Sequence, residues 1–289
     1  PPPPPARKNL LSRSYPPAAT DRLWQKGRWR PLYAGTQTKY ETQGQTNSGD
    51  LQTQAQNVLS VYSQQTTQNS GRGIYMKALF FGSIGVLAET SELQRQAFNS
   101  ALEQAGLDLR WNIATYCHHL RVVGGRQRLA QTLGLGVDDP LIDQIHRHKQ
   151  DVFEALVAAR QITPRRGITD VIARARADGM NLAFVTTTTS QQLALISNAL
   201  SDSVDLNSFD LVTSKADVTA EKPDSEVYHV ALERLGLAAN EVIAIEDTEM
   251  NQAAAVGAGI DCCLFAGEYA TVTHGDRQIH DAVHALGNT

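Results

Sequence analysis

From about residue 77 to residue 265, short apolar runs alternate with segments in which apolar residues recur at helical spacing. Short apolar runs, typical of strands buried on both faces of a sheet, are predicted at residues 77–81, 182–185, 209–213, 241–246 and 260–265. Between them, apolar positions recur at helical spacing over residues 91–106, 167–179, 190–200, 223–236 and 250–257. Strands that alternate with helices predict an α/β fold with a doubly wound parallel sheet.

A helical segment without strands interrupts this alternation after the first strand. Helices are predicted at residues 91–106, 125–134 and 141–160. We therefore expect a core made of residues 75–89 and 166–289, with a helical cap at residues 90–165 inserted into it. The Gly-rich segment 133–136 follows a helix rather than a strand, so it is interpreted as a helix end and not as a nucleotide-binding loop.

Residues 1–74 have a different composition from the rest. They open on five prolines, and eight of the thirty residues 41–70 are Gln. Such a segment cannot bury enough apolar surface to offset the entropy of ordering, so an extended, low-complexity arm is predicted. The arm holds nine basic residues against three acidic ones, whereas the whole chain has a net charge of −4. A basic arm therefore precedes an acidic body.

One stretch of the arm, residues 21–33, combines aromatic and basic side chains. Such residues dominate binding hot spots because they bury much area and make directional contacts. The candidate partner-binding residues are Arg22, Trp24, Lys26, Arg28, Trp29, Arg30 and Tyr33. Their charge favours acidic protein subunits of a large complex as partners. The alternative is an inert linker with incidental aromatics. Nucleic acid is not expected, because the charge is modest and no binding motif is present.

The cysteine content and the hydropathy of the chain indicate the kind of cellular compartment in which we expect the protein. The three cysteines, Cys117, Cys262 and Cys263, cannot form a disulfide framework, which favours a reducing compartment. A zinc site is not expected, since side chains of the neighbours His118 and His119 would diverge on a helix. No apolar run of about 18 residues exists, so no membrane-spanning helix is expected.

Four motifs in the predicted core occur in the order found in a known family. They are the first strand and its continuation, KALFFGSIGVLAET (77–90); Thr186 after the strand 182–185; Lys222 and Pro223 with Tyr228 downstream; and IEDT (245–248), followed by AAAVGAG (253–259). This pattern resembles the haloacid dehalogenase (HAD) superfamily. Residues 87–98 and 123–128 resemble its CbbY-type branch of sugar-bisphosphate phosphatases from photosynthetic organisms. The resemblance covers about residues 75–270.

The resemblance implies a fold and a chemistry. The family attacks phosphorus with a carboxylate on the first strand and protonates the leaving oxygen with a second carboxylate two residues on. Those positions are Gly82 and Ile84 here. Of the family's Mg²⁺ ligands, only the carbonyl of residue 84 and Asp247 remain, so the metal site is expected to be lost and no cofactor is predicted. Neither Glu89 nor Glu246 is expected to replace the missing nucleophile.

Other polar residues of the motifs are retained. Thr186 and Lys222 would suit an anion, so they are candidate vestigial phosphate-binding residues, with Asp247 as a vestigial metal ligand. Purely local hydrogen bonding explains Thr186 and Lys222 equally well. Arg126 and Arg128 lie where the resemblance implies contact with a second phosphate, and a solvated helix face explains them equally well.

These observations lead to a functional prediction. The missing carboxylates favour a catalytically inactive, HAD-like scaffold or linker protein that docks through its arm. Because the branch resembles proteins of photosynthetic lineages, a plastid light-harvesting assembly such as a phycobilisome is the predicted context, with a transit peptide already removed. The alternatives are a sugar-phosphate phosphatase with residual activity and a regulator that binds a sugar phosphate without hydrolysing it.

Overall fold

A parallel sheet forms the centre of the computed structural model, which describes residues 22–25, 28–31, 76–122 and 124–270. The strand order is β5-β4-β3-β6-β7. The bounds of these strands are β3 Ala78–Phe81, β4 Asn181–Phe184, β5 Leu211–Val212, β6 Val242–Glu246 and β7 Asp261–Leu264. Every pairing is parallel, with Phe81 opposite Phe184 on one side and Ile245 on the other. The predicted strand set and the doubly wound parallel α/β fold are confirmed.

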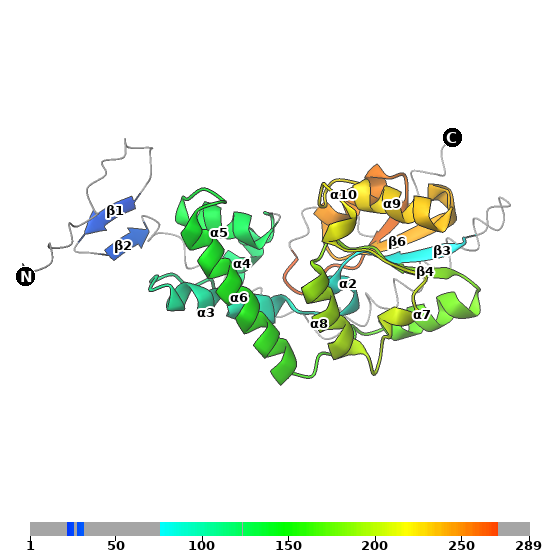
Figure 1. The fold of residues 1–289 in the computed structure, drawn as a ribbon, viewed down its shortest axis with the longest axis horizontal. Helices are drawn as coiled ribbons and strands as arrows, with labels where there is room; N and C mark the ends of the chain where they lie inside the picture. The colour runs from blue at the N-terminus through cyan, green and yellow to red at the C-terminus, as the bar shows by residue number, and fades with distance from the viewer. Residues whose placement is uncertain (1–21, 26–27, 32–75, 123, 271–289) are drawn as a thin grey trace, which may run out of the picture. The chain divides into compact units, whose positions relative to one another are not determined.

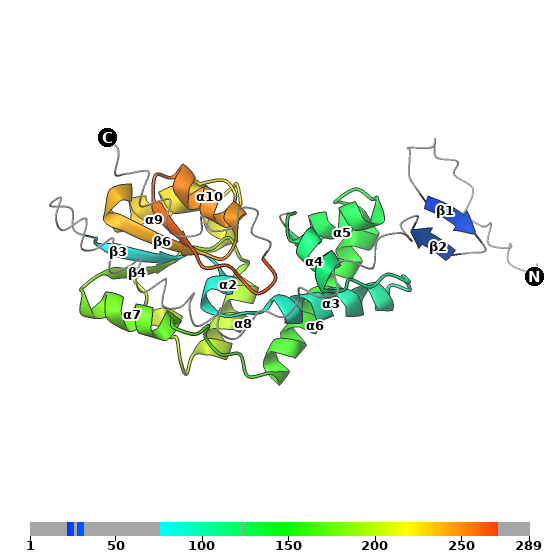
Figure 2. The ribbon, with the colours of Figure 1, turned by 180° about the vertical axis from the view of Figure 1, so that it is seen from behind.

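Helices cover both faces of this sheet (Figures 1 and 2). They are α2 Ile84–Leu87, α7 Ile168–Ala177, α8 Ser190–Leu200, α9 Glu226–Leu235 and α10 Glu249–Gly257. Alternate side chains of β3 point to opposite faces. Leu79 and Phe81 pack with α7 and α8, whereas Ala78 and Phe80 pack with α9 and α10. The two apolar layers explain why the strands read as continuous apolar runs.

Four helices follow β3 and α2 before the chain returns to the sheet. They are α3 Ser91–Gln104, α4 Ile113–His119, α5 Gly125–Leu133 and α6 Pro140–Ala159. Their shared apolar cluster is centred on Phe98, Trp111, Tyr116 and Leu129. The structure adds α4 to the predicted helices, and we refer to α3–α6 as the cap.

Local signals account for the ends of these helices. Asp139 caps α6 by accepting the amide of Leu141 at 2.8 Å, with Pro140 at the first helical position. Gly236 ends α9 in the left-handed conformation with φ of 64°. Helix α9 begins at Glu226, three residues after the predicted start, because the segment after Pro223 forms a turn. Short 3₁₀ turns complete the core: Leu206–Ser208, Lys215–Asp217 and Ala239–Glu241.

Most of the predicted arm lies outside the described residues. Its described part is a two-stranded antiparallel pair, β1 Arg22–Gln25 and β2 Arg28–Pro31, with Trp24 opposite Trp29. The chain divides into two compact units, Pro1–Gly44 and Gln45–Thr289, so the boundary at residue 74 stays a prediction. Within the described ranges, no helix is long and apolar enough to cross a membrane.

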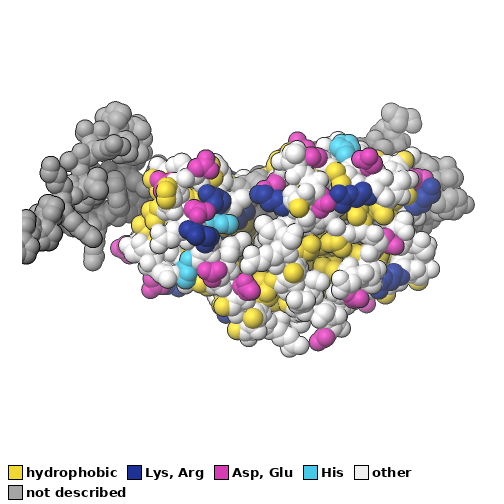
Figure 3. All heavy atoms as spheres, viewed as in Figure 1, with side chains coloured by type: hydrophobic (Ala, Val, Ile, Leu, Met, Phe, Trp, Pro, Cys, Tyr) yellow, Lys and Arg dark blue, Asp and Glu magenta, His cyan; other side chains and the backbone are white. Residues whose placement is uncertain are grey.

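Acidic and basic side chains are interspersed on the face of the described core and cap that Figure 3 shows. On this face the net acidity of the body does not gather into one patch.

Candidate functional site

Three strands end at one polar cluster. Gly82 follows β3, Val185 follows β4, and Glu246 is the last residue of β6. Because carboxyl ends of parallel strands share one edge of the sheet, residues far apart in sequence meet there, as in other open α/β sheets. This edge holds the retained motif residues.

Lys222 lies at the middle of the cluster. Its side chain is only 5% exposed, and its ammonium donates to the carbonyls of Gly82 at 2.5 Å and Val185 at 2.8 Å. It also donates to Glu246 Oε1 at 2.5 Å, in a buried ion pair. With the hydroxyl of Tyr228 at 3.3 Å, four acceptors surround the three ammonium protons. Lys222 thus ties the ends of β3, β4 and β6 together, which supports the local hydrogen-bonding interpretation for this residue.

Glu246 occupies the volume left open by Gly82. A Cβ atom added to Gly82 would stand 2.0 Å from Glu246 Oε1 and 2.5 Å from the hydroxyl of Tyr228. Tyr228 donates to Oε1 at 2.6 Å, while Oε2 is buried and has no hydrogen-bond partner. Burial raises the pKa of Glu246, and the ion pair with Lys222 opposes that rise. A carboxylate therefore stands beside the strand end that lacks one.

Thr186 serves local structure. It is buried, and its hydroxyl accepts the amide of Thr188 at 3.1 Å and contacts the Thr188 hydroxyl at 3.0 Å. Its backbone is tied to the hydroxyl of Thr213 by two bonds of 2.9 Å. These contacts fix the chain where it leaves β4.

Hard oxygen donors gather around the turn after β3. Asp247 Oδ2 lies 2.0 Å from where a Cβ on Gly85 would stand, and its Oδ1 accepts from Asn251 at 3.0 Å. Two buried oxygens near this turn, Ser83 Oγ and Glu246 Oε2, have no partner among the described residues. Unpaired oxygens and a carboxylate suit Mg²⁺, which takes one or two protein carboxylates and fills its shell with water and phosphate oxygens. The residues present therefore fit a magnesium ion.

Arg165 connects the returning cap–core linker to this turn. Its guanidinium donates to the carbonyls of Gly85 at 2.9 Å, Phe265 at 2.7 Å and Ala266 at 2.6 Å, and it stacks on the Phe265 ring at 3.5 Å. Sequence reasoning missed this residue, because nothing local distinguishes a buried arginine from the exposed Arg166 beside it.

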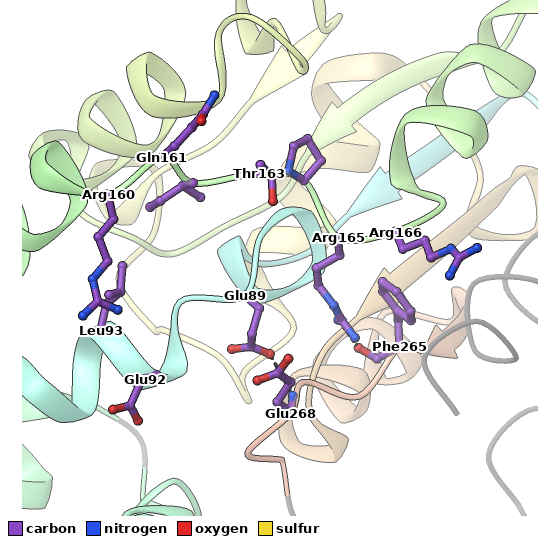
Figure 4. Close-up of a pocket in the computed structure, with 12 residues that line it drawn as sticks. Glu89, Glu92, Leu93, Arg160, Gln161, Thr163, Arg165, Arg166, Phe265 and Glu268 are labelled. Atoms are coloured by element: carbon purple, nitrogen blue, oxygen red, sulfur yellow. Dashed lines mark hydrogen bonds between the residues drawn. The ribbon is translucent and has the colours of Figure 1, made fainter. Parts of the chain in front are cut away.

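A cavity of about 360 Å³ lies where the chain passes between core and cap, and it is lined by Glu89 on one side and by residues 160–166 on the other. Figure 4 shows Glu89 and Glu268 pointing toward each other and Arg165 pointing toward them from the linker. Both carboxylate oxygens of Glu89 accept backbone amides, those of Ser91 and Glu268, at 2.8 Å. The Glu89 carboxylate is therefore engaged in holding this loop.

The cap holds a group of basic side chains. Lys149 is buried between the rings of Phe98 and Phe153, 5.0 Å from each centroid, and its ammonium bonds Gln150 at 3.0 Å. Burial first, and then the charge of Arg128, lower the pKa of Lys149 to about 7. Lys149 lies on the apolar stripe of α6, at helical spacing from buried Ile145 and Phe153, and this position was the missed sequence signal.

The two arginines predicted to meet a second phosphate differ in their contacts. Arg126 forms an ion pair with Asp143 at 2.5 Å, which favours the surface interpretation. Arg128 donates through Nε to the carbonyl of Val122 at 2.8 Å, and its charge lowers the pKa of Lys149. The structure therefore favours Arg128 over Arg126 as an anion contact.

The candidate residues of the arm remain predictions. Lys26 and Tyr33 lie outside the described residues, and Trp24, Trp29 and the three arginines belong to β1 and β2, of which only the backbone is described. The acidic partner and the plastid localisation also stay predictions.

Comparison with known proteins identifies the relatives. The family model of the haloacid dehalogenase-like hydrolases matches residues 85–265. Protein CbbY of Rhodobacter capsulatus is 37% identical over 205 residues, which is 70% of this chain and 88% of that protein. The phosphorylated carbohydrates phosphatase of Thermotoga maritima is 26% identical over 193 residues, 64% of this chain and 83% of that protein.

Solved structures agree with these relatives. CbbY from Rhodobacter sphaeroides in complex with phosphate has a TM-score of 0.62 and 33% identity, covering 73% of this chain and 96% of that one. A mutant of the same protein in complex with xylulose-(1,5)bisphosphate has a TM-score of 0.62, 34% identity and the same coverage. The likeness thus includes the sheet and the cap helices.

These relatives correct the functional prediction. The interpretation as an inactive linker, scaffold or photosynthetic pseudoenzyme is wrong, because the matched proteins are CbbY proteins and a phosphatase of phosphorylated carbohydrates. The prediction relied on two missing side chains and gave too little weight to the rest of the domain.

The cofactor prediction is also wrong. HAD hydrolases related to CbbY normally use Mg²⁺, and the carboxylate of Asp247 beside the turn after β3 is a ligand that suits this ion. The prediction weighed Glu246 only as a replacement nucleophile and took the missing carboxylate of position 82 to abolish metal binding. With its sheet, its cap and its matched motifs, the chain belongs to the haloacid dehalogenase-like hydrolase family and, within it, to the CbbY-type branch.

Proposed function

We propose that this chain is a sugar-phosphate phosphatase that releases inorganic phosphate from a phosphorylated sugar. The observation on which the proposal rests is the buried Lys222–Glu246 pair at the ends of β3 and β6, directly before Asp247. A buried ion pair is costly to keep, and here it holds a carboxylate next to the metal-compatible turn. The related CbbY proteins and the Thermotoga phosphatase support the substrate class.

The residues of the core would have separate roles at the reacting phosphate. Asp247 would hold Mg²⁺, which would neutralise charge on the phosphate oxygens. Lys222 holds the β3 end in place, and its charge opposes the rise that burial causes in the pKa of Glu246. Arg165 fixes the turn at Gly85 from the other side. The core thereby presents a rigid, preorganised anion site.

The cap would contact the distal part of the substrate. Arg128 is near enough for its charge to lower the pKa of Lys149, and neither side chain has an acidic partner among the described residues. A second phosphate would relieve the repulsion between these cations. A bisphosphorylated sugar, such as the xylulose-(1,5)bisphosphate bound by the related CbbY, is therefore the proposed substrate type.

Turnover is expected to be slow. Ile84 carries no proton, so the leaving oxygen lacks a general acid, whose contribution is typically about 10²–10⁴-fold. The protein would therefore rely on positioning and on electrostatic stabilisation of the phosphate.

A phosphate-release assay tests the proposal. The full chain is incubated with xylulose-1,5-bisphosphate and Mg²⁺, and slow release that ends on addition of a chelator is expected. Asp247→Asn should abolish release, whereas Asp202→Asn, on an exposed turn, should leave it unchanged. Release no faster than in a protein-free control, or equal release by wild type and Asp247→Asn, would overturn the proposal.

A further inference from the structure

We propose that the carboxylate of Glu246 replaces the missing carboxylate of β3 and receives the phosphoryl group. The inference deepens the proposed function and rests on it. Glu246 on β6 would thus be the catalytic residue, because Gly82, which follows β3, has no side chain.

Position is the first argument. Glu246 Oε1 and Cδ lie 2.0 and 2.2 Å from where the Cβ of a residue at position 82 would stand. A carboxylate reaching from β6 therefore takes the volume in which a β3 side chain would begin. A side chain at position 82 and this placement of Glu246 exclude each other, so the glycine and the glutamate form one arrangement.

The hydrogen bonding of Glu246 is the second argument. Lys222 and Tyr228 both donate to Oε1, at 2.5 and 2.6 Å, and thereby fix the carboxylate. Oε2 is buried without a partner, which costs free energy unless a ligand supplies the missing contact. Oε1 is held by two donors and Oε2 carries no hydrogen bond, so Oε2 is the oxygen that would form the bond to phosphorus.

Other carboxylates near the turn are already engaged. Glu89 accepts backbone amides with both oxygens, and Asp247 Oδ1 accepts from Asn251. Among the buried side-chain atoms of the described residues that lack a partner, Glu246 Oε2 is the one carboxylate oxygen. Position separates Glu246 from Asp247, because the carboxylate of Asp247 lies against Gly85 and that of Glu246 lies against Gly82.

The reaction balances without a further reactant. One oxygen of Glu246 forms a bond to phosphorus as the bond from phosphorus to the sugar oxygen breaks, and the departing oxygen takes a proton from water. A second water then attacks phosphorus, the glutamyl–phosphate bond breaks, and inorganic phosphate leaves with the carboxylate restored. The proton released in this step neutralises the hydroxide formed in the first.

Beryllium fluoride tests the assignment independently of turnover, because it forms an adduct with a carboxylate that accepts phosphoryl groups. The full chain is titrated with beryllium fluoride and Mg²⁺ and followed by ¹⁹F NMR. A bound resonance is expected in wild type and in Glu233→Gln, an exposed glutamate of α9, and its loss is expected in Glu246→Gln. A bound resonance that persists in folded Glu246→Gln would overturn the inference.

A wild-type measurement covers the case in which Glu246→Gln does not fold. The chain is treated with acetyl phosphate and Mg²⁺, and hydroxylamine converts any acyl phosphate to a hydroxamate that mass spectrometry locates. Modification at Glu246 supports the inference, and modification elsewhere or none overturns it. Phosphate release without an adduct at Glu246 overturns only this inference, whereas an adduct without release contradicts only the proposed function.

Discussion

Glu246 Oε1 lies 2.0 Å from the point at which a β-carbon on Gly82 would stand, although the two residues are 164 positions apart in the sequence. Lys222 contacts both, through the carbonyl of Gly82 and the carboxylate of Glu246. A change at any of these three residues therefore affects the other two.

Gly82→Ala should destabilise the fold. The added methyl group overlaps a carboxylate that Lys222 and Tyr228 hold in place, so Glu246 must move and lose those bonds. Overpacking of this kind costs about 1–3 kcal/mol, measurable by urea denaturation. Gly257→Ala is the matched control, since its new methyl group meets Ser225 at an ordinary 3.5 Å. Equal stability of Gly82→Ala and wild type would contradict the overlap.

Lys222→Met should be more harmful than the double change Lys222→Met with Glu246→Gln. The single variant leaves a fully buried carboxylate without its cation, at a cost of about 3–5 kcal/mol, whereas the double variant removes both charges. Denaturation of the two variants at pH 7 checks the order. If the double variant is the less stable, the pair does not act as a buried ion pair.

Arg165→Met should loosen the turn after β3. The substitution leaves the carbonyls of Gly85, Phe265 and Ala266 without their donor, and buried unpaired groups cost about 1–3 kcal/mol each. We expect faster hydrogen exchange at residues 85–88 and 265–268, together with a lower kcat. The exposed neighbour Arg166→Met should change neither. Unchanged exchange in Arg165→Met would contradict its role as a positioning residue.

Lys149 should make stability increase with pH above neutrality. Burial lowers its pKa in the folded chain to about 7, whereas the ordinary value is 10.5, so the unfolded chain binds more protons between these values. Across this window Lys149 should raise the free energy of unfolding by up to about 1.4 kcal/mol per pH unit. Well below pH 7 both states are protonated at Lys149, so the group adds no slope there.

Urea denaturation between pH 7 and 9 measures this dependence as a difference between wild type and Lys149→Met, which cancels other titrating groups. The variant should be more stable than wild type at pH 7 and should lack the Lys149 slope. Lys215→Met, at an exposed lysine, is the control. Parallel curves for wild type and Lys149→Met would contradict the prediction.

The sequence by itself determined the sheet and the positions of the motifs. Strands such as Ala78–Phe81 and Val242–Glu246 are buried on both faces, so each reads as an apolar run that needs no knowledge of its neighbours. The same holds for α6, whose start follows from Asp139 and Pro140. These features are local, since propensity, capping and periodicity act within a few residues.

The tertiary structure alone decided what the missing carboxylates mean. From the sequence, Gly82 and Ile84 indicated an empty site, because a pattern of residues records which side chain is absent and not which one moves into its place. The fold brings Glu246, Lys222 and Tyr228 to the end of β3 and places Arg165 against Gly85. Such contacts depend on strand order and on packing between segments 80 or more residues apart, and these long-range interactions leave no local signal in the sequence.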